Sequence, residues 1–144
     1  MKIILKAIFP GSFDPIHDGH LNIIKKASTL FSKLYVVITN NLEKSNQTNI
    51  KTRAKQAAIA CQNLNLNIEI VINDQMLTSD FAKQLGAKYI IRGLRNNNDL
   101  KYEMELAFAN KQLNKDLETI FFIVDYGLNE ISSTFLNQIK QLKK

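Results

Sequence analysis

Residues 3–27 read IILKAIFPGSFDPIHDGHLNIIKKA, and three patterns in this stretch together indicate the fold. The apolar run from Ile3 to Phe9 has the length and composition of a buried strand. Residues 11–20 then supply turn-forming and polar side chains, among them two histidines and two aspartates. From Leu21 onward, apolar residues recur at helical spacing. The stretch therefore predicts a strand, a polar turn and a helix in direct succession.

The same alternation continues along the rest of the chain. Further short apolar runs fit buried strands at Leu34–Thr39, Ile68–Ile72, Tyr89–Arg92 and Thr119–Val124. Helical spacing of apolar residues occurs at Leu21–Phe31, Ala54–Cys61, Phe81–Leu85, Tyr102–Leu113 and Ile131–Leu142. This order predicts an α/β fold, a Rossmann-like, doubly wound, five-stranded parallel sheet with helices on both faces. Ligands of such sheets bind beyond the carboxyl ends of the strands, where the polar turn after Phe9 is expected.

Length and composition are those of one globular domain. The chain has 144 residues, of which 45% are hydrophobic and 22% charged, so we expect a single domain over residues 1–144. Lys6 and Pro10 interrupt the N-terminal apolar run, and no segment approaches the ~18 apolar residues of a membrane span. We therefore expect a cytoplasmic protein that does not bind membranes. The single cysteine, Cys61, has no partner for an internal disulfide.

The formal net charge of +6 has two interpretations, a polyanionic partner or a composition rich in lysine and asparagine. The lysines are spread along the chain without an arginine-rich arm, so we expect no nucleic-acid partner. The sequence also lacks a glycine-rich dinucleotide fingerprint, a GxxxxGK loop and a nucleophile elbow. Neither a hydride-transfer enzyme nor a Walker-type ATPase is indicated.

Polar and basic side chains gather at the predicted carboxyl ends of the strands. They are Ser12, Asp14, His17 and His20 after the first strand, Lys44 after the second, Arg92 and Arg95 after the fourth, and residues 131–134 (ISST) after the fifth. This set is rich in hydrogen-bond donors and poor in carboxylates, which suits a phosphate ligand. Taken singly, His17 is a turn residue, Ser132 a helix cap and Lys44 a loop lysine. Their joint occurrence favours the phosphate site.

Two motifs resemble those of known enzymes. PGSFDPIHDGH (residues 10–20) resembles the signature of the nucleotidyltransferase superfamily, in which [TH]xGH follows the first strand. That motif alone also admits cytidylyltransferases, mononucleotide adenylyltransferases and class I aminoacyl-tRNA synthetases. IIRGLRNNNDLKYEMELAFAN (residues 90–110), followed by ISST, is more selective. Together the motifs resemble the bacterial phosphopantetheine adenylyltransferases, from about Ile8 to the last helix.

The resemblance implies a reaction and an assembly. Members of that family transfer the adenylyl group of ATP to 4'-phosphopantetheine, giving dephospho-coenzyme A and pyrophosphate in coenzyme A biosynthesis. They use Mg²⁺, which we expect to be held mainly by the ATP phosphates and by no metal-binding residue of the protein. The attacking phosphate is already ionised at neutral pH and needs no general base, which accounts for the scarcity of carboxylates. The family also implies a homo-oligomer, expected to be a hexamer.

The resemblance further implies the role of each matching residue. The catalytic residues are expected to be His20, which would stabilise the transition state at the α-phosphate, with Lys44 and Arg92. Phosphopantetheine is expected to contact Ser12, Lys44, Thr78 and Arg92. ATP is expected to contact Ser12, Phe13, His20, Gly93, Leu94, Arg95, Glu103, Leu128, Asn129, Glu130, Ile131, Ser132, Ser133 and Thr134. Without the resemblance, Glu103 would be interpreted as a helix-surface carboxylate.

Two alternatives stay open at this point. One is a related transferase with another phosphorylated acceptor, such as nicotinate mononucleotide or glycerol 3-phosphate; RGLR together with ISST speaks against it. The other is a non-catalytic protein that binds nucleotides or nucleic acid. Retention of Ser12, His20, Lys44 and Arg92 argues for catalysis, because a binder needs no transition-state donor. The chain departs from the family at Ser45 and Asn46, where a lysine and a proline are usual.

Overall fold

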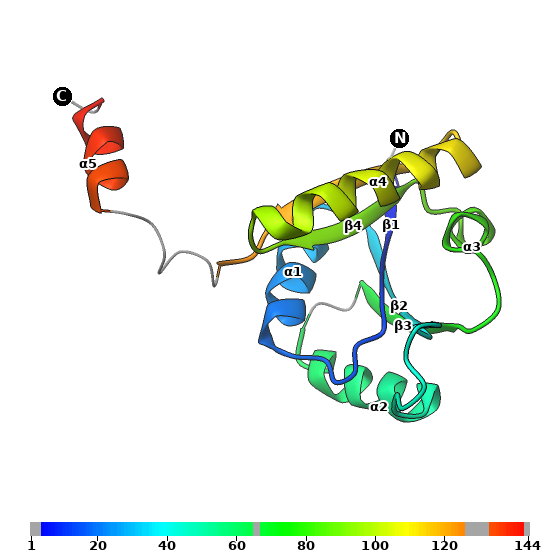
Figure 1. Cartoon of the computed structure of the whole chain (residues 1–144). Helices are drawn as coiled ribbons and strands as arrows, with labels where there is room; N and C mark the ends of the chain where they lie inside the picture. The colour runs from blue at the N-terminus through cyan, green and yellow to red at the C-terminus, as the bar shows by residue number, and fades with distance from the viewer. Residues whose placement is uncertain (1–3, 65–66, 126–132, 143–144) are drawn as a thin grey trace.

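The structure is a computed structural model that describes residues 4–64, 67–125 and 133–142. Within these ranges five strands alternate with five helices (Figure 1). In chain order they are β1 (Lys6–Gly11), α1 (Asp18–Ser28), β2 (Lys33–Thr39), α2 (Ile50–Cys61), β3 (Ile68–Asn73), α3 (Thr78–Leu85), β4 (Tyr89–Leu94), α4 (Asn97–Leu113), β5 (Glu118–Ile123) and α5 (Ser133–Gln141).

All strand pairs are parallel, and the sheet order is β3-β2-β1-β4-β5. The chain therefore runs outward from β1 to β3 and then crosses back to place β4 on the other side of β1. Because parallel crossovers are right-handed, this reversal puts α1 and α2 on one face of the sheet and α3 and α4 on the other. The predicted doubly wound sheet is confirmed. Its point of reversal lies between β1 and β4, where such sheets bind ligands.

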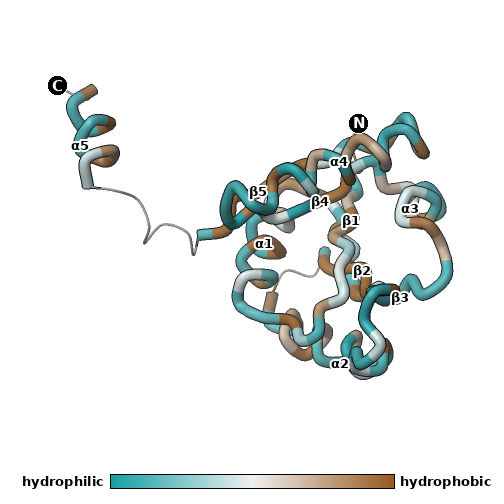
Figure 2. Tube along the Cα trace, viewed as in Figure 1, coloured by the Kyte–Doolittle hydropathy of each residue, from teal (hydrophilic) through white to brown (hydrophobic). Residues whose placement is uncertain are grey.

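Two hydrophobic cores flank the sheet. Alternate residues of β1 point to opposite faces, so Ala7 and Phe9 join the core beneath α1 and α2, while Ile8 joins the core beneath α3. On the first face Ile24 and Ala27 of α1 are completely buried. Hydrophobic residues recur along the strands, and hydrophilic residues are frequent along the helices (Figure 2).

The first strand differs from its prediction of Ile3–Phe9. Ile4 and Leu5 lie before β1 and are 67% and 38% exposed, whereas Pro10 and Gly11 belong to the strand. β1 pairs with β2 along its whole length but with β4 only at Ala7 and Ile8. Pro10, which has no N–H, thus lies where β1 and β4 have separated and no ladder bond to β4 is needed. This separation opens the space for a site.

Polar caps explain why three helices begin before their predicted apolar stripes. The side chains of Asn49 and Asn96 accept from backbone N–H groups two residues further on, so α2 begins at Ile50 and α4 at Asn97. His17 caps α1 in the same way. Apolar periodicity begins only where a helix meets the core, one turn or more after the cap.

The last helix, α5, has no buried residue and is drawn apart from the sheet in Figure 1. Its apolar side chains, Phe135, Leu136 and Ile139, are exposed, as is Leu142 just after it. Residues 131 and 132, predicted to begin this helix, lie outside the described residues. None of the helices in the described ranges has both the length and the apolar character needed to cross a membrane.

Candidate functional site

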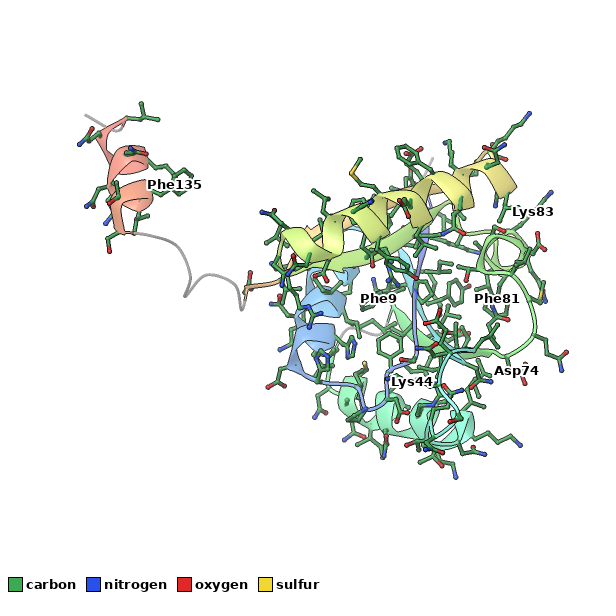
Figure 3. The ribbon with its side chains drawn as sticks, in the orientation of Figure 1. Phe9, Lys44, Asp74, Phe81, Lys83 and Phe135 are labelled. Atoms are coloured by element: carbon green, nitrogen blue, oxygen red, sulfur yellow. The ribbon has the colours of Figure 1, made fainter. Side chains whose placement is uncertain are left out.

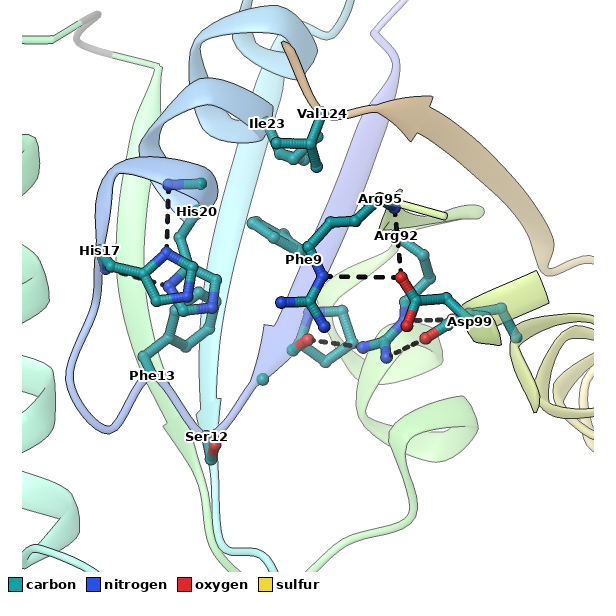
Figure 4. A pocket seen from close by; sticks show the side chains of 15 residues that line it. Phe9, Ser12, Phe13, His17, His20, Ile23, Arg92, Arg95, Asp99 and Val124 are labelled. Carbon is teal, nitrogen blue, oxygen red and sulfur yellow. Dashed lines mark hydrogen bonds and ion pairs between the residues drawn. The ribbon is translucent and has the colours of Figure 1, made fainter. Parts of the chain in front are cut away.

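A cavity of about 310 Å³ opens at the carboxyl ends of β1 and β4, where the two strands separate. Its walls come from the turn after β1, the start of α1, the end of β4 and the start of α4. Phe13, His17 and His20 lie on one side of it and Arg92 and Arg95 on the other (Figure 4). The structure therefore brings together residues from two distant parts of the sequence, as the strand-end argument predicted.

A reciprocal pair of hydrogen bonds fixes the two histidines at the start of α1. Nδ1 of His17 accepts from the backbone N–H of Gly19, and Nδ1 of His20 accepts from the backbone N–H of His17, both over 3.1 Å. The rings stack with centroids 3.7 Å apart. Because Nδ1 of a neutral imidazole that accepts a bond carries no proton, the proton of His20 lies on Nε2. His20 therefore presents a hydrogen-bond donor.

The environment of His20 keeps its imidazole neutral. Partial burial, with smaller contributions from the nearby His17, Arg95 and Arg92, lowers the pKa of His20 to about 4. Burial lowers the pKa because the charged form loses hydration, and nearby positive charges act in the same direction. At neutral pH His20 is thus an uncharged Nε2–H donor, held by its helix cap.

The ring of Phe13 packs against the ring of His20. The Phe13 side chain is 1% exposed, and its ring centroid lies 4.7 Å from that of His20 and 5.3 Å from that of Phe9. Its backbone φ of +47° is left-handed, a conformation that costs a non-glycine residue on the order of 1 kcal/mol. A Cβ at Gly11 would lie 3.0 Å from the Phe13 ring, so glycine permits this close approach.

Arg92 and Glu103 form a two-pronged ion pair at the base of the cavity. Nε and Nη2 of Arg92 donate to the two carboxylate oxygens of Glu103 over 2.7 and 2.6 Å, and Nη1 donates to the Pro10 carbonyl over 3.0 Å. These bonds use three of the five N–H groups of the guanidinium and leave two for a ligand. The prediction put Glu103 at the ATP site; it lines the cavity, and its carboxylate binds Arg92.

Arg95 lies at the rim of the same cavity and has a carboxylate neighbour. Its Nε is 3.6 Å from Oδ2 of Asp99, and its backbone N–H donates to the same oxygen over 3.2 Å. The Arg95 side chain is 68% exposed, so a ligand can compete for it. Asp99 was not among the predicted site residues, although its position four residues after Arg95 is a signal for such a pair.

A second cavity, of about 500 Å³, shares a wall with the first. Arg92, Pro10 and Gly11 line both cavities, and the second extends to Asn73 and Thr78. Thr78, the first residue of α3, lines this cavity together with Arg92, and its predicted contact with phosphopantetheine stays a prediction. Further lining residues that sequence reasoning missed include Asn73, Met76, Leu77, Tyr102 and Asn110. Asn73, Met76 and Leu77 lie outside the quoted motifs, and Tyr102 and Asn110 lie within the motif of residues 90–110 without having been given a role.

Several predicted site residues lie elsewhere in the structure. Lys44 is exposed in the loop between β2 and α2 (Figure 3), and Leu94 pairs with Ile123 in the sheet; neither residue lines either of these two cavities. Ser133 and Thr134 begin α5 and also line neither cavity. Leu128, Asn129, Glu130, Ile131 and Ser132 lie outside the described residues. The predicted roles of these residues stay predictions.

Comparison with known proteins gives a family and named relatives. Residues 8–139 match the family model described as cytidylyltransferase-like. The chain is 46% identical over 138 residues to a phosphopantetheine adenylyltransferase of Mycoplasma mycoides subsp. mycoides SC, a match that covers 96% of this chain and 98% of the relative. A phosphopantetheine adenylyltransferase of Mycoplasma capricolum is 44% identical over the full length of both chains.

Solved structures show the same fold at lower sequence identity. The nicotinic acid mononucleotide adenylyltransferase of Plasmodium falciparum, complexed with NaAD, superposes with a TM-score of 0.62 at 20% identity, covering 96% of this chain and 90% of that one. A lipopolysaccharide core biosynthesis protein of Thermoplasma volcanium gives a TM-score of 0.58 at 17% identity, with 85% of this chain and 97% of that chain covered.

Proposed function

The chain belongs to the phosphopantetheine adenylyltransferases of the cytidylyltransferase-like family, and from this we propose that it transfers the adenylyl group of ATP to 4'-phosphopantetheine. The products are dephospho-coenzyme A and pyrophosphate, as in coenzyme A biosynthesis. One observation carries this proposal beyond the family: two cavities meet at Arg92, at the reversal point of the sheet. A nucleotide in one and a phosphorylated acceptor in the other would meet at that guanidinium.

The composition of each cavity indicates which substrate it takes. The smaller one carries Ser12, His20 and Arg95, which suit the phosphates of ATP. The larger one is lined mostly by neutral polar and apolar side chains such as Asn73, Leu77 and Tyr102, with Arg92 and one carboxylate, Asp74, as its charged residues. This is the arrangement that a long, uncharged pantetheine arm with a terminal phosphate would need.

The reaction requires alignment and charge stabilisation from the protein. An oxygen of the acceptor phosphate attacks the α-phosphorus of ATP, a new P–O bond forms, and the bond to the pyrophosphate oxygen breaks. The attacking oxygen is already ionised, so no base is needed. Negative charge grows on the non-bridging α-oxygens, and a fixed donor such as Nε2–H of His20 stabilises it. Arg92 offsets the repulsion between the two phosphates while holding them close.

Mg²⁺ is proposed as the metal that accompanies ATP. The two carboxylates that line the smaller cavity, Asp99 and Glu103, are both paired with arginines. Among the described residues no group of three or more carboxylate, histidine or cysteine side chains is placed to hold a metal ion. These residues therefore fit an ion held by the triphosphate itself, where it would neutralise part of the phosphate charge.

Pyrophosphate release with different acceptors tests the proposal. The protein is mixed with ATP, Mg²⁺ and either 4'-phosphopantetheine, nicotinate mononucleotide or glycerol 3-phosphate. We expect pyrophosphate with 4'-phosphopantetheine alone. Equal or faster release with another acceptor would assign the chain to a related transferase, and no release with any acceptor would favour a nucleotide-binding protein.

We further propose a cytoplasmic homo-oligomer, expected to be a hexamer. An apolar stripe on the outer side of α4 supports self-association, because Leu100, Met104 and Phe108 follow one another at four-residue spacing and are 39%, 42% and 69% exposed. Light scattering at micromolar concentration tests this. A monomer mass would overturn it, and Phe108→Glu is expected to shift the mass distribution toward smaller species.

A further inference from the structure

One arginine outside both cavities is fully buried. Arg53 of α2 is 0% exposed, although arginine is almost never fully buried without partners. Its guanidinium makes four hydrogen bonds, to the carbonyls of Thr48, Ser12 and Thr39 and to the side-chain oxygen of Asn40, over 2.6 to 2.7 Å. All four acceptors are uncharged oxygens.

These acceptors belong to segments that border the site. Ser12 lies in the turn between β1 and α1, Thr39 and Asn40 mark the end of β2, and Thr48 closes the loop that carries Lys44. One guanidinium therefore ties three backbone segments together. A further hydrogen bond joins the turn after β1 to the loop that carries Lys44, because the Asp14 carboxylate accepts from the Thr48 backbone N–H over 3.0 Å.

The bond to Ser12 sets the orientation of a peptide that faces the smaller cavity. In a trans peptide the carbonyl of one residue and the N–H of the next point in opposite directions. With the Ser12 carbonyl directed to Arg53, the Phe13 N–H points away from α2. This peptide precedes the left-handed φ of Phe13, a conformation that persists only where surrounding contacts hold it.

From this geometry we propose that Arg53 is a positioning residue for adenylyl transfer. Its guanidinium holds the Ser12–Phe13 peptide in the orientation that faces the ATP phosphates. It also fixes the loop that carries Lys44 relative to that peptide. Its positive charge also interacts with the nearby Asp14 carboxylate, which accepts from Thr48 in the same loop, so charge and hydrogen bonds act together to hold these segments. The inference rests on the proposed function, since it concerns how that reaction is aligned.

Two substitutions separate the effect of the hydrogen bonds made by the Arg53 guanidinium from the effect of its positive charge. Arg53→Lys keeps the charge but replaces the planar, five-donor fork with one nitrogen, and Arg53→Met removes both. Lys55→Met is the matched control, because Lys55 is exposed on the same helix and loses the same charge. For each variant kcat, both KM values and the melting temperature are measured at a temperature where the variant is folded.

We expect Arg53→Lys to lower kcat by at least about tenfold, because small misplacements of reacting groups have effects of that order. Arg53→Met is expected to raise the KM for ATP as well, and Lys55→Met to match the wild type. An Arg53→Lys variant with a lower melting temperature but wild-type kcat and KM would reduce Arg53 to a packing role. A wild type without activity toward 4'-phosphopantetheine would instead contradict the proposed function.

A measurement on the wild-type protein covers the case in which Arg53→Lys does not fold. Arg53 Nε–H is followed by NMR while α,β-methylene-ATP, which cannot be cleaved at the α–β bridge, is added. A positioning residue is expected to shift its signal as the analogue binds. An unchanged Arg53 signal, alongside a shifted His20 signal, would overturn the proposal.

Discussion

The backbone N–H of His17 donates to Nδ1 of His20, so the residue that caps α1 also determines which nitrogen of its neighbour carries a proton. The helix start and the proposed catalytic donor are thus one structural unit. The same unit explains why the turn after β1 contains two histidines: His17 accepts from the Gly19 amide at the start of the helix, and His20, which lines the cavity, keeps Nε2–H free to donate.

His20→Ala is expected to lower kcat by about 10²-fold while changing either KM by only a few-fold. Loss of a donor that acts mainly in the transition state has this signature. Steady-state kinetics and a melting curve check it, with Lys25→Ala as a control on the exposed side of α1. A folded His20→Ala enzyme with near-normal kcat would leave His20 as a capping residue.

Stability is expected to fall between pH 6.5 and about 4 because of His20. Its pKa is about 4 in the folded chain against an ordinary 6.5, mainly through burial. In that window the unfolded chain binds a proton that the folded chain does not, so acid favours unfolding. Melting curves at pH 7.5 and 5 check this: the wild type should lose more stability than His20→Ala. Equal losses would contradict the assignment.

Arg92→Met is expected to raise the KM for phosphopantetheine, lower kcat and destabilise the fold by about 3 kcal/mol. The stability loss follows because Glu103, 6% exposed, would keep a buried charge without its partner. The double variant Arg92→Met with Glu103→Leu is expected to regain stability but not activity. Denaturant unfolding and kinetics on both variants separate the two effects; a double variant as unstable as the single one would contradict the argument.

Lys44→Ala is expected to raise the KM for phosphopantetheine and lower kcat without lowering the melting temperature, because Lys44 is exposed and lines neither of the two cavities. The predicted contact would then form only with substrate bound. Lys51→Ala, exposed at the start of α2, serves as the charge-matched control. Identical kinetics for the two variants would remove Lys44 from the site.

The sheet and the clustering at its reversal point were predictable because buried strands and helical stripes are encoded by local periodicity. The start of β1 was not predictable, since Ile4 and Leu5 are apolar yet exposed, and Leu5 bonds only to Ser32 and to Lys33 at the very start of β2. The Arg92–Glu103 ion pair could not be predicted from the spacing of residues in the sequence either, because Glu103 becomes buried only when α4 packs across β4. Arg53 resembles any helix arginine in sequence, and only the meeting of three segments around α2 buries it.

Gly19→Ala is expected to lower both the melting temperature and kcat, with the loss of kcat smaller than in His20→Ala. A Cβ at position 19 would lie 2.9 Å from Cε1 and 3.1 Å from Nδ1 of His17, so the His17 ring must move and its cap bond must break. Loss of such a cap costs about 1 kcal/mol. The displaced His17 ring also no longer stacks on His20, so the orientation of Nε2 of His20 becomes less fixed.

Asp18→Ala, which alters the adjacent residue without filling this space, is the control and should retain wild-type kcat. Unchanged kinetics in Gly19→Ala would show that the stacked histidine pair does not orient the donor.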